Sequence, residues 1–283
     1  MKRISAFIYL LLIFSIAHSE TRIVAHSQVF QGRSFIVFLR TAESDSKVKE
    51  VFVSFNGKKI PFFSYEGGLR AIIGTMPEEK PGDYPLEIEL IKDNGEKEVF
   101  EQSIDVAYRN YPKVSFWLKP AKKKLLTADV IAEEWAKIEE KILKLSEDKL
   151  WDGFFIKPVP GITTMPFGMR EFINNKVAGR HRGWDFRAKV GTPVKSAQNG
   201  VVRVAEFFKS FGGTVVVDHG QGINTLYFHL SKINAEPGQK LSKGEIIGLS
   251  GNTGISSGPH LHWGMSVHNI RVDPMQWVNT IMP

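Results

Sequence analysis

The chain of 283 residues contains no cysteine. This absence excludes disulfide bonds, cysteine nucleophiles, thiolate metal sites and the lipid-attachment cysteine of a lipoprotein. Any metal site must therefore be built from carboxylates and from the eight histidines. Long apolar runs are missing too, because no segment after the N-terminus approaches the roughly 18 continuous apolar residues of a membrane-spanning helix.

The N-terminal segment has the features of a secretory signal peptide. Lys2 and Arg3 precede an apolar run over residues 4–17, which is too short to span a bilayer comfortably. Small residues stand at the −3 and −1 positions of a cleavage site after Ser19. We therefore expect residues 1–19 to be removed, and the mature protein to be exported with no stable insertion in a membrane. A retained membrane anchor is the alternative.

Acidic residues are outnumbered, since 37 Lys and Arg face 30 Asp and Glu and give a formal net charge of +7. This excess favours anionic partners, such as an acidic cell-wall polymer or a membrane surface. It predicts no nucleic acid partner, because the chain is expected to be exported and has no dense basic stripe. With 42% hydrophobic and 24% charged residues, the composition is that of a globular protein with one or two domains.

Residues 20–112 are predicted to form an immunoglobulin-like β-sandwich domain. Short segments rich in Val, Ile, Phe and Tyr alternate there with turn signals such as Asn56-Gly57. The expected strands cover residues 34–40, 48–55, 69–73, 84–91 and 97–107. His26 is the only histidine of this region and is interpreted as structural.

Residues 113–152 are predicted to be a linker with a connecting helix. Thr127 is a suitable N-cap, and the apolar residues that follow recur at spacings of four and three. This face consists of Ile131, Trp135, Ile138, Ile142 and Leu145. It is too short for a coiled coil and is expected to pack against a neighbouring domain.

Residues 153–283 are rich in β-strand and glycine signals and contain six of the eight histidines. His260 and His262 frame Leu261 in a predicted strand, where residues two apart point to the same face. The pair follows a loop of small residues, 250–259, which would let a substrate approach the backbone closely. On its own, such a pair is weak evidence for a metal or catalytic site.

A second segment adds a carboxylate. His181 and Asp185 are four residues apart, so that an extended chain places both on one side, and Gly183 between them removes a side chain that would crowd the site. Histidine, aspartate and histidine with an open fourth position are the ligands of a catalytic zinc ion. His229 lies in another apolar strand, and histidines beside a metal can transfer protons or stabilise an oxyanion at neutral pH.

Several motifs in one order resemble the lysostaphin/LytM-type zinc metallopeptidases, which cleave peptide bonds in bacterial peptidoglycan. The resemblance covers residues 155 to about 277. Its motifs are Phe167-Gly168-Met169-Arg170, His181–Gly191 continuing through Thr192-Pro193-Val194, Tyr227-Phe228-His229-Leu230, and Gly251–Gly254 with Gly258-Pro259-His260-Leu261-His262-Trp263. Residues 20–112 are similar to the immunoglobulin-like domain of some bacterial members.

The resemblance implies a role for each of five residues. His181, Asp185 and His262 would bind zinc, while His229 and His260 would be the catalytic pair that activates water and stabilises the oxyanion. Which of the two histidines is the base stays open. The resemblance further implies a C-terminal antiparallel β-sheet peptidase domain over residues 153–283, within a chain that is mainly β.

Two functions follow from this interpretation. The first is an exported zinc endopeptidase of peptidoglycan stem peptides or cross-links. We expect it in the periplasm, because we find no lipoprotein cysteine, wall-sorting signal or wall-binding repeats in the sequence, and the alternative is a secreted or cell-wall-associated enzyme. D,D-endopeptidase or carboxypeptidase action is the expected specificity. The alternative is a non-catalytic wall-binding adaptor, or an activator of other wall hydrolases, that uses the same groove.

Overall fold

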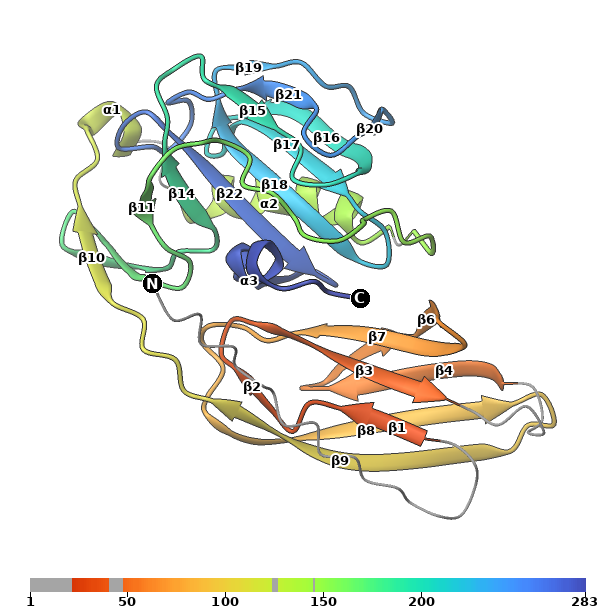
Figure 1. The fold of residues 1–283 in the computed structure, drawn as a ribbon. Coiled ribbons are helices and arrows are strands. Elements are labelled where there is room, and N and C mark those ends of the chain that lie inside the picture. The colour runs from red at the N-terminus through yellow and green to blue at the C-terminus, as the bar shows by residue number, and fades with distance from the viewer. Residues whose placement is uncertain (1–21, 41–47, 124–126, 145) are drawn as a thin grey trace, which may run out of the picture. The chain divides into compact units, whose positions relative to one another are not determined.

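The computed structural model describes residues 22–40, 48–123, 127–144 and 146–283, and it confirms a mainly β protein (Figure 1). The predicted signal peptide and Leu145 of the predicted helix lie outside the described residues. The chain separates into two compact units. Within the described residues, the N-terminal unit contains 22–30, 35–73 and 80–108, and the C-terminal unit contains 31–34, 74–79 and 109–283.

The N-terminal unit is built from two sheets around one apolar core. The first sheet has the order β1 (Arg22–Ala25), β3 (Ser34–Arg40), β7 (Gly68–Gly74) and β6 (Phe63–Tyr65), and the second has the order β2 (Gln28–Phe30), β9 (Lys97–Ala107), β8 (Gly82–Lys92), β4 (Val48–Phe55) and β5 (Lys58–Pro61). Alternate residues of both sheets, such as Val37, Val53 and Ile88, are buried together. All five strands expected here are present, and the immunoglobulin-like assignment stays a prediction.

The C-terminal unit is organised around an eight-stranded sheet in which every pairing is antiparallel. Its order is β11 (Thr163–Met165), β14 (Trp184–Arg187), β22 (His260–Val267), β18 (Ile223–Leu230), β17 (Gly212–Asp218), β16 (Gly200–Phe208) and β20 (Lys240–Leu241), with β23 (Ile270–Val272) beside β22.

Smaller elements surround this sheet. One three-stranded sheet joins β10 (Lys113–Phe116), β12 (Arg170–Ile173) and β13 (Lys176–Arg180), and another joins β15 (Pro193–Lys195), β21 (Ile246–Leu249) and β19 (Lys232–Ile233). The helices are α1 (Pro120–Lys123), α2 (Ala128–Ile142) and α3 (Pro274–Asn279). Among the described residues, no helix is both long and apolar enough to cross a membrane.

Helix α2 begins directly after Thr127 and belongs to the C-terminal unit. Ile138 and Ile142 of its apolar face are buried against Val204, Leu226 and Phe228 of the large sheet. The predicted amphipathic stripe therefore packs on the strands that carry the histidines, and Figure 1 shows the helix lying across β16, β17 and β18.

His219 has the structural role that its turn context suggests. The side chain is fully buried, with Nδ1 at 2.6 Å from the carbonyl oxygen of Asn199 and Nε2 at 2.8 Å from the hydroxyl of Thr225. Burial lowers the pKa of His219 to about 4, so that the ring is neutral at physiological pH. It ties two strands and a turn together, away from the histidines described next.

Candidate metal centre and active site

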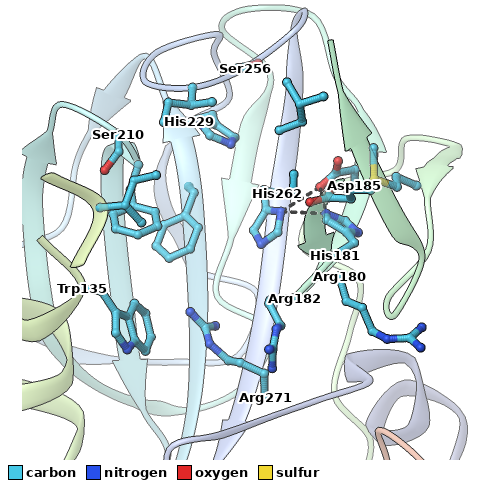
Figure 2. Close-up of a pocket in the computed structure, with 18 of the residues that line it drawn as sticks. Trp135, Arg180, His181, Arg182, Asp185, Ser210, His229, Ser256, His262 and Arg271 are labelled. Carbon is cyan, nitrogen blue, oxygen red and sulfur yellow. Dashed lines mark hydrogen bonds and ion pairs between the residues drawn. The ribbon is translucent and has the colours of Figure 1, made fainter. Parts of the chain in front are cut away.

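Three of the predicted site residues meet at the edge where β14 pairs with β22. Asp185 on β14 lies directly opposite His262 on β22, and directly opposed residues of antiparallel strands have neighbouring side chains. His181 lies just before β14, and it is buried, as is Asp185. The structure thus brings together all three residues that were predicted as ligands (Figure 2).

Their donor atoms form a nearly equilateral triangle. Nε2 of His181 is 3.0 Å from Oδ1 of Asp185 and 3.0 Å from Nδ1 of His262, and the third edge is 2.9 Å. Donor atoms around a tetrahedral zinc ion are about 3.3 Å apart, since each bond is about 2 Å long. Nδ1 of His181 is 3.1 Å from the carbonyl oxygen of Pro166, and this contact leaves Nε2 as the atom that can bind a metal. The residues therefore fit a metal ion held by three ligands.

Gly183 makes room for this triangle. A β-carbon at this position would collide with Nε2 of His262 and would lie 2.8 Å from the carbonyl oxygen of Trp263. The backbone oxygen cannot move aside as the end of a flexible side chain can. The expectation that Gly183 removes a crowding side chain is confirmed.

Electrostatics inside the triad favour a cation. Burial alone would raise the pKa of Asp185, but the charges and hydrogen bonds of His181 and His262 hold it well below its usual range. Burial opposes protonation of His181, yet neighbouring Asp185 raises its pKa to about 9, while burial lowers the pKa of His262 to about 4. The carboxylate of Asp185 thus favours a positive charge at the triad, which a metal ion would supply.

His260 faces the same cavity as His262, as the two-residue period of a strand predicts, whereas Leu261 is fully buried. Nδ1 of His260 is 2.8 Å from the carbonyl oxygen of Gly258, and Nε2 is 3.6 Å from Oδ2 of Asp185. The carbonyl fixes the tautomer by accepting the Nδ1 proton, so that Nε2 is directed at the triad.

His229 reaches the cavity through a β-bulge. Leu226 and Phe228 face α2, whereas Tyr227 points the other way and accepts a hydrogen bond from the backbone of Ala197. Simple alternation would place His229 with Tyr227. Instead, the register between β17 and β18 shifts here, and His229 has a φ of +63°, which turns its side chain back into the cavity.

Hydrogen bonding and burial fix the state of His229. Nδ1 is 2.9 Å from the carbonyl oxygen of Thr253, and the ring centroid is 4.9 Å from that of His260. Burial, reinforced by His260 and His262, holds the pKa of His229 well below its ordinary value. A neutral ring whose Nδ1 proton is engaged keeps a lone pair on Nε2, and can accept a proton there.

The five predicted residues line one cavity of about 550 Å³ in the C-terminal unit. Ile255, Ser256 and Ser257 of the predicted glycine-rich loop also line it. Sequence reasoning did not identify several other lining residues, namely Trp135, Glu171, Arg180, Arg182, Phe228 and Arg271. Phe228 stacks on the ring of His262 with 5.4 Å between centroids and 15° between planes. Of these residues, Arg271 had a signal in the sequence, because it is a cation between two apolar residues, Ile270 and Val272.

Comparisons with known proteins agree with this arrangement. Residues 179–274 match the peptidase family M23. The chain is 46% identical over 96 residues to the peptidoglycan DD-endopeptidase ShyA of Vibrio cholerae, which covers 34% of this chain and 22% of the relative. It is 36% identical over 124 residues to the DD-carboxypeptidase/endopeptidase Mpg of Neisseria meningitidis, covering 44% of this chain and 29% of that protein.

A solved structure resembles more of the chain. It is described as a candidate M23 peptidase from Pseudomonas aeruginosa, with a TM-score of 0.62 and 27% identity over 88% of this chain and 94% of the other. By contrast, the chain matches only about a fifth to a third of the length of the relatives ShyA and Mpg.

Proposed function

We propose that the protein is a zinc-dependent hydrolase of peptide bonds in bacterial peptidoglycan, since its residues 179–274 match peptidase family M23. The single observation that carries the proposal is the convergence of two imidazoles and one carboxylate beside two further histidines in one cavity. The relatives named as peptidoglycan peptidases support the choice of substrate.

In this proposal His181, Asp185 and His262 hold the zinc ion, and the triangle of their donor atoms leaves one side toward the cavity. A zinc ion in such a site polarises a substrate carbonyl and lowers the pKa of water. The protein contributes preorganisation, because the carbonyl of Pro166 orients His181 and the missing side chain of Gly183 leaves space for His262.

His229 and His260 are proposed as the proton-transferring pair. Each ring is held through Nδ1 by a backbone carbonyl, that of Thr253 or Gly258, and Nε2 remains available in the cavity. One ring would take a proton from the attacking water, and the other would stabilise the negative charge that develops on the carbonyl oxygen or protonate the leaving amine.

The test is digestion of isolated sacculi by purified residues 20–283, with the released muropeptides identified by mass spectrometry. We expect peptide-bond cleavage that a chelator abolishes and that zinc restores. Cleavage that resists the chelator, or none after zinc loading, would contradict the proposal. Sacculus binding without cleavage would support the adaptor function instead.

The same digestion identifies the bond. Release of a terminal residue indicates carboxypeptidase action, and conversion of dimers to monomers indicates endopeptidase action. Both are named activities of the relatives, and we propose D,D-specificity on that basis. Export to the periplasm, directed by residues 1–19, would bring the enzyme to this substrate.

A further inference from the structure

Arg271 is a buried cation in the wall of the cavity. It lies in the short strand β23 between Ile270 and Val272, with only 9% of its surface exposed. The residue lines the same cavity as the metal-binding triad. Figure 2 shows its side chain beside that of Arg182 and in the same view as His181 and His262.

No anion compensates this charge within the described residues. The buried Nη1 atom of Arg271 has no hydrogen-bond partner there. The charged neighbour that affects its pKa is another cation, Arg182, which together with burial lowers the pKa to about 9. A buried guanidinium with a free donor is costly unless an anion or a ligand pairs with it.

The ion pairs that the described residues form around the cavity do not include Arg271. Arg182 is paired with Glu78, with Nη2 2.8 Å from Oε1, and its side chain is 43% exposed. Burial raises the pKa of Glu171, and the charged groups that act on it are His181, Asp185 and Arg182 rather than Arg271. Among the described residues, no ion pair therefore compensates the charge of Arg271 in the cavity wall.

Aromatic side chains and a glycine hold the guanidinium in place. Its central carbon lies 4.4 Å from the ring centroid of Trp135 and 5.9 Å from that of Phe228. A β-carbon on Gly264 would lie 2.6 Å from Nη1 of Arg271, so the group occupies the space above this glycine. Gly264 follows His262 by two residues on the same face of β22, a step of about 7 Å along the strand.

We propose that Arg271 is a specificity-determining residue that binds a free carboxylate of the substrate within about one residue of the scissile bond. This inference rests on the proposed function, and it narrows the substrate class to peptides with a free carboxylate near the cleaved amide. The planar guanidinium matches a carboxylate with two parallel N–H donors, and its position one strand step from His262 suits a group adjacent to the reacting carbonyl. Arg182 adds positive potential to the same wall.

The first test measures binding without catalysis, in metal-free protein, so that no metal ion can attract the carboxylate. The probes are N-acetyl-D-alanyl-D-alanine and its C-terminal amide, titrated into protein labelled with 5-fluorotryptophan. The ¹⁹F signal of Trp135 is assigned by its loss in Trp135→Phe. We expect the acid to bind about tenfold more tightly than the amide and to shift the Trp135 signal.

Arg271→Gln should weaken binding of the acid to the level of the amide. Gly264→Ala offers an independent variant that keeps the charge but displaces the guanidinium, and should have the same effect if Arg271→Gln does not fold. Arg182→Gln, on the exposed side, should change the preference less than threefold. Retention of the full preference for the acid in Arg271→Gln or in Gly264→Ala would overturn the proposal, as would equal binding of both probes by the parent protein.

The second test separates this inference from the proposed function. Zinc-loaded protein is given muropeptides with free carboxylates and the same muropeptides after amidation, and kcat/KM is measured. We expect amidation to reduce kcat/KM about tenfold, chiefly through KM, and Arg271→Gln to abolish the difference. If Arg271→Gln instead lowers kcat/KM equally on both substrates and keeps the preference for free carboxylates, Arg271 has a structural role only. If no muropeptide is cleaved, the proposed function fails, while the binding experiment still decides whether the carboxylate site exists.

Discussion

The two units of the chain are both built from β-strands, yet they bury different side chains. In the N-terminal unit, two charged side chains, Arg70 and Lys92, are buried among the described residues beside an apolar core cluster. The C-terminal unit buries more of them, with nine acidic, basic or histidine side chains less than a tenth exposed among its described residues, and four of these line one cavity: His181, Asp185, His229 and Arg271. Burying such groups costs stability unless they are paired or bind a ligand.

The difference in buried ionisable groups indicates which part of the molecule is expected to carry a functional site. A domain selected for stability alone gains most from an apolar interior, since each buried ionisable group must be compensated. In the C-terminal unit, His181 and Asp185 compensate one another at 3.0 Å, yet Arg271 keeps a buried donor without a partner. Buried polar groups that lack some of their hydrogen-bond partners within the protein are expected in a binding site.

The comparison is tested most strongly at His181. We expect His181→Ala to lower zinc affinity by more than 100-fold and to remove hydrolysis of sacculi, because a ligand is lost rather than a group that orients a ligand. Zinc affinity is measured by competition with a chromophoric chelator. His26→Ala, in the N-terminal unit, is the matched control and should bind zinc as the parent does. Equal zinc affinity in both variants would break the comparison.

His229 separates metal binding from proton transfer within the C-terminal unit. His229→Ala should bind zinc within about twofold of the parent, because His229 is not one of the three clustered donors. The turnover rate should fall by about 10² to 10⁴-fold, the usual contribution of a group that transfers a proton. The two measurements are chelator competition and muropeptide release, and full activity of His229→Ala would remove this residue from the mechanism.

Gly183 tests whether the space around the triad matters. In Gly183→Ala, the added methyl group must displace His262 or the strand that carries Trp263, and we expect zinc affinity to fall about 10- to 100-fold, as when an orienting group is removed. Gly258→Ala is the control from the loop that follows the lining residue Ser257, because a β-carbon there would meet no atom within 4 Å. A similar loss in both variants would show that glycine acts here through chain flexibility rather than space.

The sequence predicted much of this site for identifiable physical reasons. The strand period of two placed His260 and His262 on one face, and the apolar spacing of three and four predicted α2. Both are local rules, and the residues concerned obey them. The grouping of distant segments, 181–185 with 260–262, needed the family resemblance, because periodicity within one segment does not reveal which strand lies beside it.

The features that escaped prediction depend on tertiary structure. The bulge that turns His229 into the cavity has no local signature, since His229 is an ordinary histidine in an apolar strand and its φ of +63° is imposed by the register between β17 and β18. The carbonyls of Thr253 and Gly258 orient the rings of His229 and His260, but every residue carries a carbonyl. Arg271 was not among the predicted site residues, because a cation between two apolar residues does not indicate what it faces.

The smallest expected effect concerns stability, and His219 carries it. Its pKa is about 4 in the folded protein and about 6.5 when unfolded, so protons bind preferentially to the unfolded chain. The stabilising contribution of neutral His219 is therefore complete above pH 6.5 and is lost as the pH falls toward 4, by up to about 1.4 kcal/mol per pH unit.

Comparison of the parent with His219→Gln isolates the pH-dependent contribution of His219 to the free energy of unfolding. The variant should be less stable at pH 8, because the hydrogen bonds to Asn199 and Thr225 are altered, and the difference should narrow as the pH falls from 6.5 to 4.5. The measurement is urea unfolding of metal-free protein, followed by tryptophan fluorescence. All six tryptophans lie in the C-terminal unit, at positions 117, 135, 151, 184, 263 and 277, so the signal reports on that unit alone. A pH-independent difference would show that His219 is not held neutral, and would remove it from the buried ionisable groups that are more numerous in this unit than in the N-terminal one.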